Sequence, residues 1–106
     1  MKIFIVKLDW STEDCHDVEL QGFTDYYKAY DVFKELIADE RKSENSWVGN
    51  VDFDEDGEPV GHYEFDFEDN NSCESEVWWH IEDQWDGRYY VYIDLIILEV
   101  QDDETL

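Results

Sequence analysis

The pattern of apolar and polar residues predicts strands at both ends of the chain. Residues Lys2–Leu8 are apolar on both faces, which is typical of a central strand covered on two sides. Residues Asp17–Phe23 alternate, with Val18 and Leu20 on one side, and we expect them to pair with the first strand in a hairpin. The last segment, Arg88–Val100, is largely apolar on both faces, so we place it beside the first strand in the sheet interior.

One segment has the spacing of an amphipathic helix. From residue 25 to about residue 41, apolar residues recur at intervals of three and four, at Tyr26, Ala29, Tyr30, Phe33, Leu36 and Ile37. Thr24 is the predicted N-cap, with Asp25 in the first turn. Arg41 and Lys42 suit the negative end of the helix dipole.

The middle of the chain reads as further strands. They are predicted at Trp47–Asp54, Val60–Glu68 and Glu76–Asp83, with a turn at Glu55–Pro59 between the first two. The predicted fold class is therefore α+β, an antiparallel sheet of five to six strands with one helix (about 25–41) packed on it. We expect residues 1–106 to form a single domain and residues 101–106 to fray.

Composition excludes several classes of protein. The 106 residues include 30 acidic and 7 basic side chains, a net charge of −23, and the aromatic share of 17% is too high for a disordered acidic tail. Such a charge repels nucleic acid and anionic lipid, so we expect no direct binding to nucleic acid or membranes. The start of the chain lacks the layout of a signal peptide, which predicts a cytoplasmic protein with Cys15 and Cys73 reduced.

The negative charge is concentrated in the second part of the chain. Residues 1–42 carry a net charge of −4 and residues 43–106 a net charge of −19. Alternate residues of a strand lie about 6.6 Å apart on one face, so an exposed row of carboxylates can stand in for phosphates. The candidate residues for this surface are Glu64, Asp66 and Glu68, with Asp52 and Asp54 on a neighbouring strand and Asp56 and Glu58 in the turn. The alternative is that these acids only solvate an exposed sheet face.

Aromatic side chains lie among these acids. Trp78 and Trp79 are adjacent in a strand, so one must face the core and the other must face away from it. Trp85 lies in a turn. Because Trp is enriched among residues that dominate binding energy, Trp78 or Trp79, together with Trp85, are the predicted anchors for a partner. A sheet covered on both faces, or a homodimer contact, would also explain them.

Catalytic and metal-site motifs are weak. Asp52–Gly57 matches the first half of an EF-hand calcium loop, but position twelve is Tyr63 instead of Glu and the flanks read as strands. The histidines and cysteines have no metal-ligand spacing, and the chain has neither a nucleophile elbow nor a phosphate-binding glycine loop. We therefore expect no enzyme activity, no cofactor and no metal site.

Short motifs in the first part of the chain resemble known proteins. Met1–Val6, Gly22–Asp25 and Lys28–Ala29 resemble a loose class of short proteins encoded by phages and other mobile elements, over about the first forty residues. The acidic second half is similar in composition to phage anti-defence proteins that mimic DNA, including anti-CRISPR and anti-restriction proteins. This resemblance implies an inhibitor in the host cell cytoplasm.

The leading hypothesis is an acidic inhibitor of a basic nucleic-acid-handling protein, such as a nuclease or a CRISPR or restriction component. It would compete with DNA by mimicking its charge. The first alternative is an immunity protein for a toxin, which predicts one partner held mainly by aromatic contacts that resist salt. The second is a non-enzymatic phage accessory protein that only oligomerises.

Overall fold

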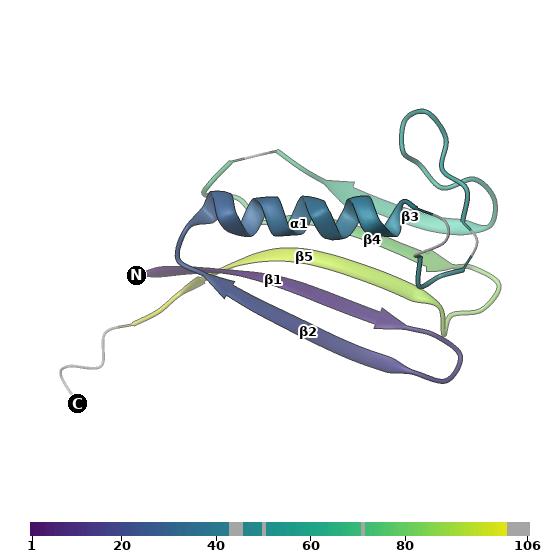
Figure 1. The fold of residues 1–106 in the computed structure, drawn as a ribbon, viewed down its shortest axis with the longest axis horizontal. Coiled ribbons are helices and arrows are strands. Elements are labelled where there is room, and N and C mark those ends of the chain that lie inside the picture. Colours follow the sequence, from purple (N-terminus) through teal and green to yellow (C-terminus); the bar gives the residue numbers. More distant parts are fainter. Residues whose placement is uncertain (43–45, 50, 71, 102–106) are drawn as a thin grey trace.

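Five antiparallel strands form one sheet, and a single helix lies along one face of it (Figure 1). The computed structural model describes residues 1–42, 46–49, 51–70 and 72–101, so most of the tail predicted to fray lies outside the described residues. The elements are β1 (Lys2–Ser11), β2 (His16–Phe23), α1 (Tyr26–Glu40), β3 (Tyr63–Glu68), β4 (Val77–Asp83) and β5 (Tyr90–Glu99). The strand order is β2-β1-β5-β4-β3. The predicted α+β fold is confirmed.

The apolar strands lie where their composition places them. β1 pairs with β2 as the predicted hairpin on one side and with β5 on the other. β5 is the central strand of the sheet. On β1, the residues that face the helix (Phe4, Val6 and Leu8) are buried, and their neighbours are half-buried. Strands that are apolar on both faces therefore form the middle of the sheet.

Helix α1 covers the predicted span but begins with a different cap. The N-cap is Asp25 instead of Thr24, since Asp25 has an extended backbone and its carboxylate accepts a hydrogen bond from Tyr27 N at 2.9 Å. A charged acceptor at this position also interacts favourably with the positive end of the helix dipole. Arg41 is the C-cap, as its place in the sequence suggests.

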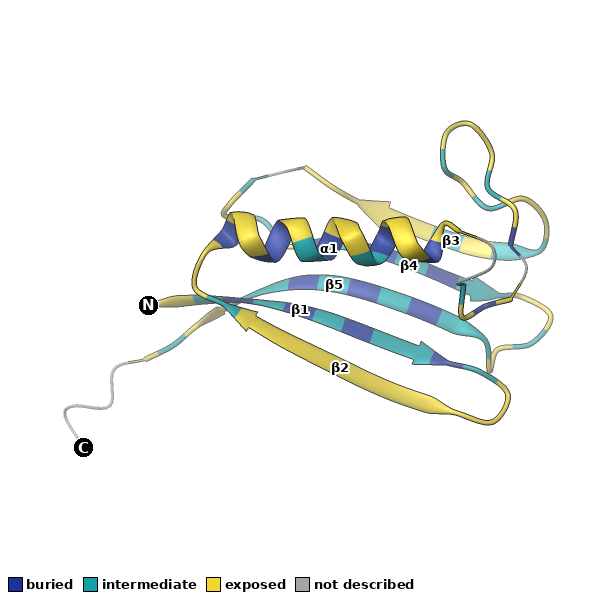
Figure 2. Ribbon diagram, in the orientation of Figure 1, coloured by how far each residue is buried: buried dark blue, intermediate teal, exposed yellow. Residues whose placement is uncertain are grey.

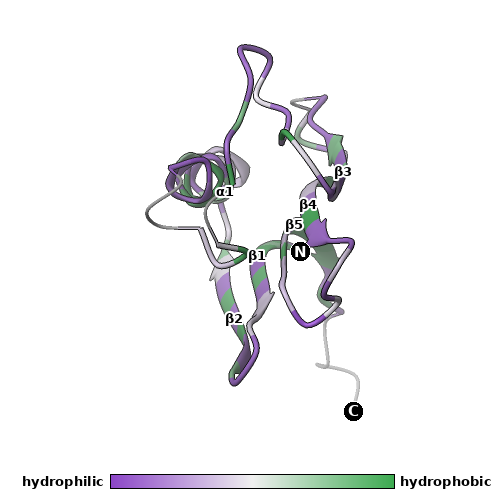
Figure 3. Cartoon of the chain, turned by 90° about the vertical axis from the view of Figure 1, so that its right-hand side faces the viewer, coloured by the Kyte–Doolittle hydropathy of each residue, from purple (hydrophilic) through white to green (hydrophobic). Residues whose placement is uncertain are grey.

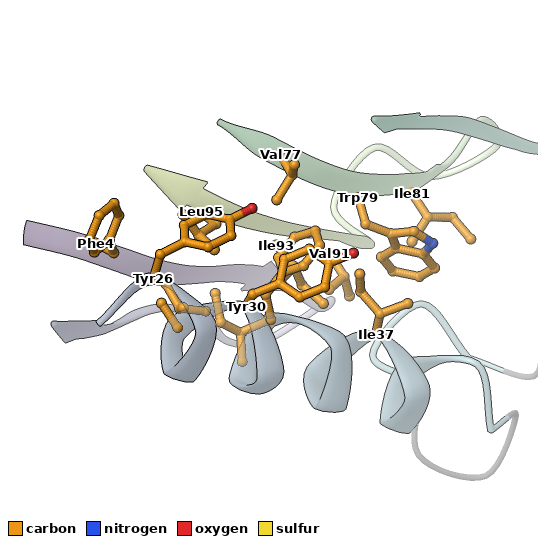
Figure 4. Close-up of a cluster of buried hydrophobic side chains, with 14 of the residues drawn as sticks. Phe4, Tyr26, Tyr30, Ile37, Val77, Trp79, Ile81, Val91, Ile93 and Leu95 are labelled. Carbon is orange, nitrogen blue, oxygen red and sulfur yellow. The ribbon is translucent and has the colours of Figure 1, made fainter. Parts of the chain in front are cut away.

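The core lies between α1 and the helix-facing side of the sheet (Figure 4). Figure 2 shows buried positions alternating along β1, β5 and β4, as expected for strands with one face against a core. The helix contributes one stripe of side chains. The fully buried larger side chains are Trp79, Phe33, Ile81, Ile93, Leu95, Val6, Val51, Val77 and Val91.

The strand predicted at Trp47–Asp54 is wrong. The described residues of this segment form a loop, with a single isolated bridge between Phe53 and Pro59. Its apolar residues serve the core instead: Val48 and Val51 are buried, and the ring of Phe53 lies 6.3 Å from that of Trp79. Because α1 packs mainly on β1, β5 and β2, this loop covers part of the sheet that the helix leaves open, and we call it the covering loop.

No helix of the described residues lies over the opposite side of the sheet (Figure 3). This side carries the apolar residues Leu20 and Leu98, which are 64% and 48% exposed. β2 is exposed along almost its whole length (Figure 2). We call this side the open face. Within the described ranges, α1 is too short and too polar to be a membrane span, and there is no other helix.

The last residue of α1, Glu40, carries a buried carboxylic acid. Glu40 is only 4% exposed, and its Oε2 accepts a hydrogen bond from Trp47 N at 3.1 Å. Burial raises the pKa of Glu40 from 4.5 to about 7, although the hydrogen bond from Trp47 acts in the opposite direction. The folded protein therefore holds this proton more tightly than the unfolded chain does.

Replacing Glu40 with glutamine should change how stability depends on pH. Since the folded pKa is raised, the contribution of Glu40 is fully present below pH 4.5 and is lost as the pH rises through about 7. The stability of Glu40→Gln relative to the native protein should therefore increase by about 3 kcal/mol between pH 4 and pH 8. Urea titrations across this range measure it. The control Glu35→Gln, on the exposed side of the same helix, should differ from the native protein by less than about 0.5 kcal/mol throughout.

Candidate binding surface

Acidic and aromatic side chains from three strands meet on the open face. The predicted acidic row of β3 is exposed at all three positions, while Tyr63, Phe65 and Phe67 point to the helix side. β4 and β5 continue this surface across the sheet. We call it the acidic face, formed by Glu64, Asp66, Glu68, Trp78, His80, Glu82, Tyr92 and Asp94.

Two carboxylates stand directly opposite each other on this surface. Glu64 of β3 pairs with Glu82 of β4 in the strand register. Like charges at such positions destabilise a sheet. Gln84 partly compensates, because its Nε2 donates to Glu64 Oε2 at 3.1 Å and to Glu82 Oε1 at 3.5 Å. The carboxylates of Glu64 and Glu82 therefore repel each other in the folded protein, and Gln84 offsets only part of this repulsion.

Histidine and tyrosine side chains lie between the carboxylates. His80 Nε2 is 2.8 Å from Asp94 Oδ1, and its ring packs 4.5 Å from that of Tyr92. The hydroxyl of Tyr92 donates to Glu82 Oε2 at 2.9 Å. Burial, followed by this hydrogen bond, raises the pKa of Tyr92 to about 12, so Tyr92 stays a neutral donor at physiological pH.

The adjacent tryptophans divide between the two sides of the sheet. Trp79 is 0% exposed and lies in the core, so it cannot contact a partner while the protein is folded. Trp78 is half-buried on the open face, and its Nε1 donates to Asp66 Oδ2 at 2.9 Å. Of the two predicted anchors, only Trp78 is therefore available on the surface.

A shallow depression lies at the centre of the acidic face. It has a volume of about 160 Å³ and is lined by Glu64, Asp66, His80, Ile81, Glu82 and Tyr92. Its walls combine carboxylates with aromatic rings, which are the groups that attract ammonium and guanidinium ions. No Lys or Arg in the described part of the chain forms an ion pair with its carboxylates. The depression thus offers acceptors that basic residues of the chain itself do not use.

The predicted acids of the loop lie elsewhere. Asp52 and Asp54 are not on a strand beside β3, because β4 is the neighbour of β3 and the loop packs on the helix side through Phe53. Asp54 Oδ1 accepts hydrogen bonds from the backbone of Asp56 and Glu58 at 2.9 and 3.0 Å. These carboxylates therefore belong to a second surface, and at least Asp54 shapes its own turn.

Trp85 extends into solvent close to the acidic face. It is 81% exposed, and its ring stacks on His62 with centroids 3.5 Å apart and planes 2° from parallel. His62 Nε2 is in turn 3.3 Å from Asp83 Oδ1. The preceding residue, Gln84, contacts Glu64 and Glu82. A large ring held in one orientation suits a contact with a partner.

Sequence reasoning missed part of this surface. His80 and Glu82 are two and four residues after Trp78 on β4, so they point to the same face of the sheet. This alternation could have placed them beside the acidic row of β3. The positions of Tyr92 and Asp94 beside this surface depend on the pairing of β4 with β5, which no local pattern reveals.

Within the described ranges, no group of three or more His, Cys, Asp or Glu residues is arranged to hold a metal ion. Both cysteines, Cys15 and Cys73, are exposed and are not bonded to each other.

No family model, curated protein or solved structure matches this chain. The features of the chain that bear on function are therefore the chemistry of the acidic face and of the sheet edge beside it.

Proposed function

We propose that this protein is an acidic inhibitor that binds a basic nucleic-acid-handling protein through its acidic face. The target would be a nuclease or a CRISPR or restriction component in the cytoplasm of a bacterial cell infected by a phage or carrying a prophage. The inhibitor would occupy the surface that otherwise binds DNA. The observation that carries the proposal is the row on β3, exposed at all three positions and extended across the sheet by Glu82 and Asp94.

The spacing of these carboxylates suits contact with a basic protein surface that otherwise binds the phosphates of DNA. Along β3 they recur about every 6.6 Å, and the next strand adds one carboxylate, Glu82, about 4.8 Å to the side. Each strand of duplex DNA carries a charge about every 3.4 Å. The row on β3 has about half the charge density of one DNA strand, and Glu82 and Asp94 add charge beside it. Lysine and arginine side chains of the target could pair with these carboxylates in place of phosphate oxygens.

Solvation alone does not account for this arrangement well. A small domain needs a net charge of only about 2–8 for solubility, whereas this chain carries −23. The register also keeps Glu64 opposite Glu82 at a cost in stability. Residues that lower stability and remain exposed are common where a protein binds a partner.

Capture of partners from a bacterial lysate at low salt tests the proposal. The expected result is that the captured proteins bind nucleic acid and that duplex DNA displaces them. Raising the salt from about 50 to about 200 mM should weaken the complex at least tenfold, because charge pairs dominate it.

The alternatives predict other outcomes of the same capture. A single partner that resists both DNA and salt would contradict charge mimicry and favour an immunity protein anchored by Trp85. A stable oligomer in light scattering, with no protein captured, would favour an accessory phage protein.

A further inference from the structure

β3 is an unpaired edge of the sheet. It pairs with β4 on one side, and no strand in the described part of the chain pairs with its other side. α1 packs mainly on β1, β5 and β2 and approaches β3 only across a shallow depression. An exposed edge strand presents a row of free backbone N–H and C=O groups, which another extended segment can pair with.

Beside this edge, on the helix side, lies an apolar depression. It has a volume of about 200 Å³ and is lined by Phe67 and Asp69 on one side and by Lys34, Ile37, Ala38 and Arg41 on the other. Phe67 is 40% exposed although it faces the helix side, and its ring stacks on Phe65 at 6.3 Å. The apolar residues of β3 are therefore only partly covered.

The two faces of β3 differ in chemistry. Phe65 and Phe67 point to the helix side, where Phe67 lines the apolar depression, whereas Glu64, Asp66 and Glu68 point to the open face. A strand added at this edge would place its alternate residues beside these two environments, about 4.8 Å from β3. Lysine or arginine fits next to the acidic row, and apolar side chains fit next to the phenylalanines.

We propose that β3 accepts an extended segment of the partner as a sixth strand, in which basic and apolar residues alternate. This inference rests on the proposed function and specifies how the basic partner is bound. Main-chain hydrogen bonds would supply affinity, and the two environments would select the alternating pattern.

A second copy of this chain does not fit the same edge. Pairing β3 with β3 of another molecule would bring the acidic row against an identical row on the same face of a continuous sheet. Like charges on neighbouring strands destabilise the pairing, and each copy carries a net charge of −23. The charge of the edge therefore selects a basic segment over self-association.

Three synthetic peptides test the proposal on the intact protein. The first alternates lysine and valine over ten residues. The second has the same composition with the lysines in one block. The third is the alternating peptide with N-methyl groups on the amides that would face β3. Affinity is measured by titration calorimetry at low salt, after sedimentation has shown that each peptide is monomeric.

The alternating peptide should bind at least tenfold more tightly than the block peptide, and methylation should remove that advantage. Only the alternating peptide should slow hydrogen exchange of amides within Tyr63–Glu68. Equal binding of the alternating and block peptides would overturn strand addition and leave charge mimicry standing. Failure of all three peptides to bind would overturn both.

A pair of matched variants tests the apolar side of the strand. Phe67→Ser should weaken the alternating peptide about fivefold, because the valines lose their contact surface. Leu98→Ser, at a similarly exposed apolar residue on the opposite face, should leave its affinity unchanged. Equal affinities of both variants and the native protein would overturn the role of the depression. If Phe67→Ser does not fold, the methylated peptide still decides the question.

Discussion

Replacing Glu64, Asp66 and Glu68 together with lysine should weaken binding of the captured partner at least a hundredfold. The three side chains are exposed, and no basic residue in the described part of the chain forms an ion pair with them. In the proposed complex, reversal replaces three attractive contacts with three repulsive ones. Close charge pairs at interfaces couple by about 1.5 kcal/mol or more, so a hundredfold loss, about 2.7 kcal/mol, is a conservative expectation.

The triple variant should remain folded. Its substitutions lie on exposed positions of an edge strand, where most changes alter stability by less than about 0.5 kcal/mol. Lysine at position 64 would face Glu82 and replace a repulsive cross-strand pair with an attractive one. The loss of the hydrogen bond from Trp78 to Asp66 acts in the opposite direction.

A control variant separates local from total charge. Replacing Asp31, Glu35 and Asp39 with lysine changes the net charge by the same amount, on the exposed side of α1. Calorimetric titration of the captured partner at two salt concentrations compares the two variants. An equal loss of affinity in both would show that only the total charge matters, which would contradict a binding site on the acidic face.

Replacing Trp79 with alanine should destabilise the protein by about 3–5 kcal/mol. Trp79 is fully buried, packs edge-on against Phe65 at 5.7 Å and lies beside Phe53 of the covering loop. Its removal leaves a cavity where β4, β3 and this loop meet. Domains of this size are stable by about 5–15 kcal/mol in total, so the loss is a large fraction.

Two further substitutions, Trp78→Ala and Trp79→Phe, test whether the loss of stability comes from the buried ring of Trp79. Trp78→Ala, one residue away on the open face, should cost less than about 1.5 kcal/mol, mainly through the lost hydrogen bond to Asp66. Trp79→Phe should cost less than Trp79→Ala, since it keeps much of the ring and removes an indole N–H that has no partner in the described structure. Urea titrations measure all three. Similar losses for Trp78→Ala and Trp79→Ala would contradict the division of the two rings between core and surface.

The covering loop shows where local patterns mislead. Residues 47–54 are rich in apolar and β-branched residues, which favours a strand. In the structure Val48 and Val51 are buried in the core, and the described backbone of this segment forms a single isolated bridge. Apolar side chains gain the same free energy of burial from a loop as from a paired strand. The sequence therefore does not indicate whether this segment forms a loop or a strand.

The sequence by itself determined the local features of this protein. The helix, the first hairpin, the alternation of acids and aromatics along β3 and the opposite directions of Trp78 and Trp79 all follow from periods of 3.6 and 2.0 residues. Backbone stereochemistry sets these periods within each segment. Neighbouring residues alone are therefore enough to predict them.

Beyond the pairing of β1 with β2 and β5, only the tertiary structure decided which segments lie side by side. It made β3 an edge strand, placed Glu82 and Asp94 beside the acidic row, and moved Asp52 and Asp54 to another surface. Strand order and register depend on how all apolar faces are buried at once, between segments far apart in the chain. The composition of the acidic face is therefore a property of the whole sheet, although the side on which each of its residues points is a local one.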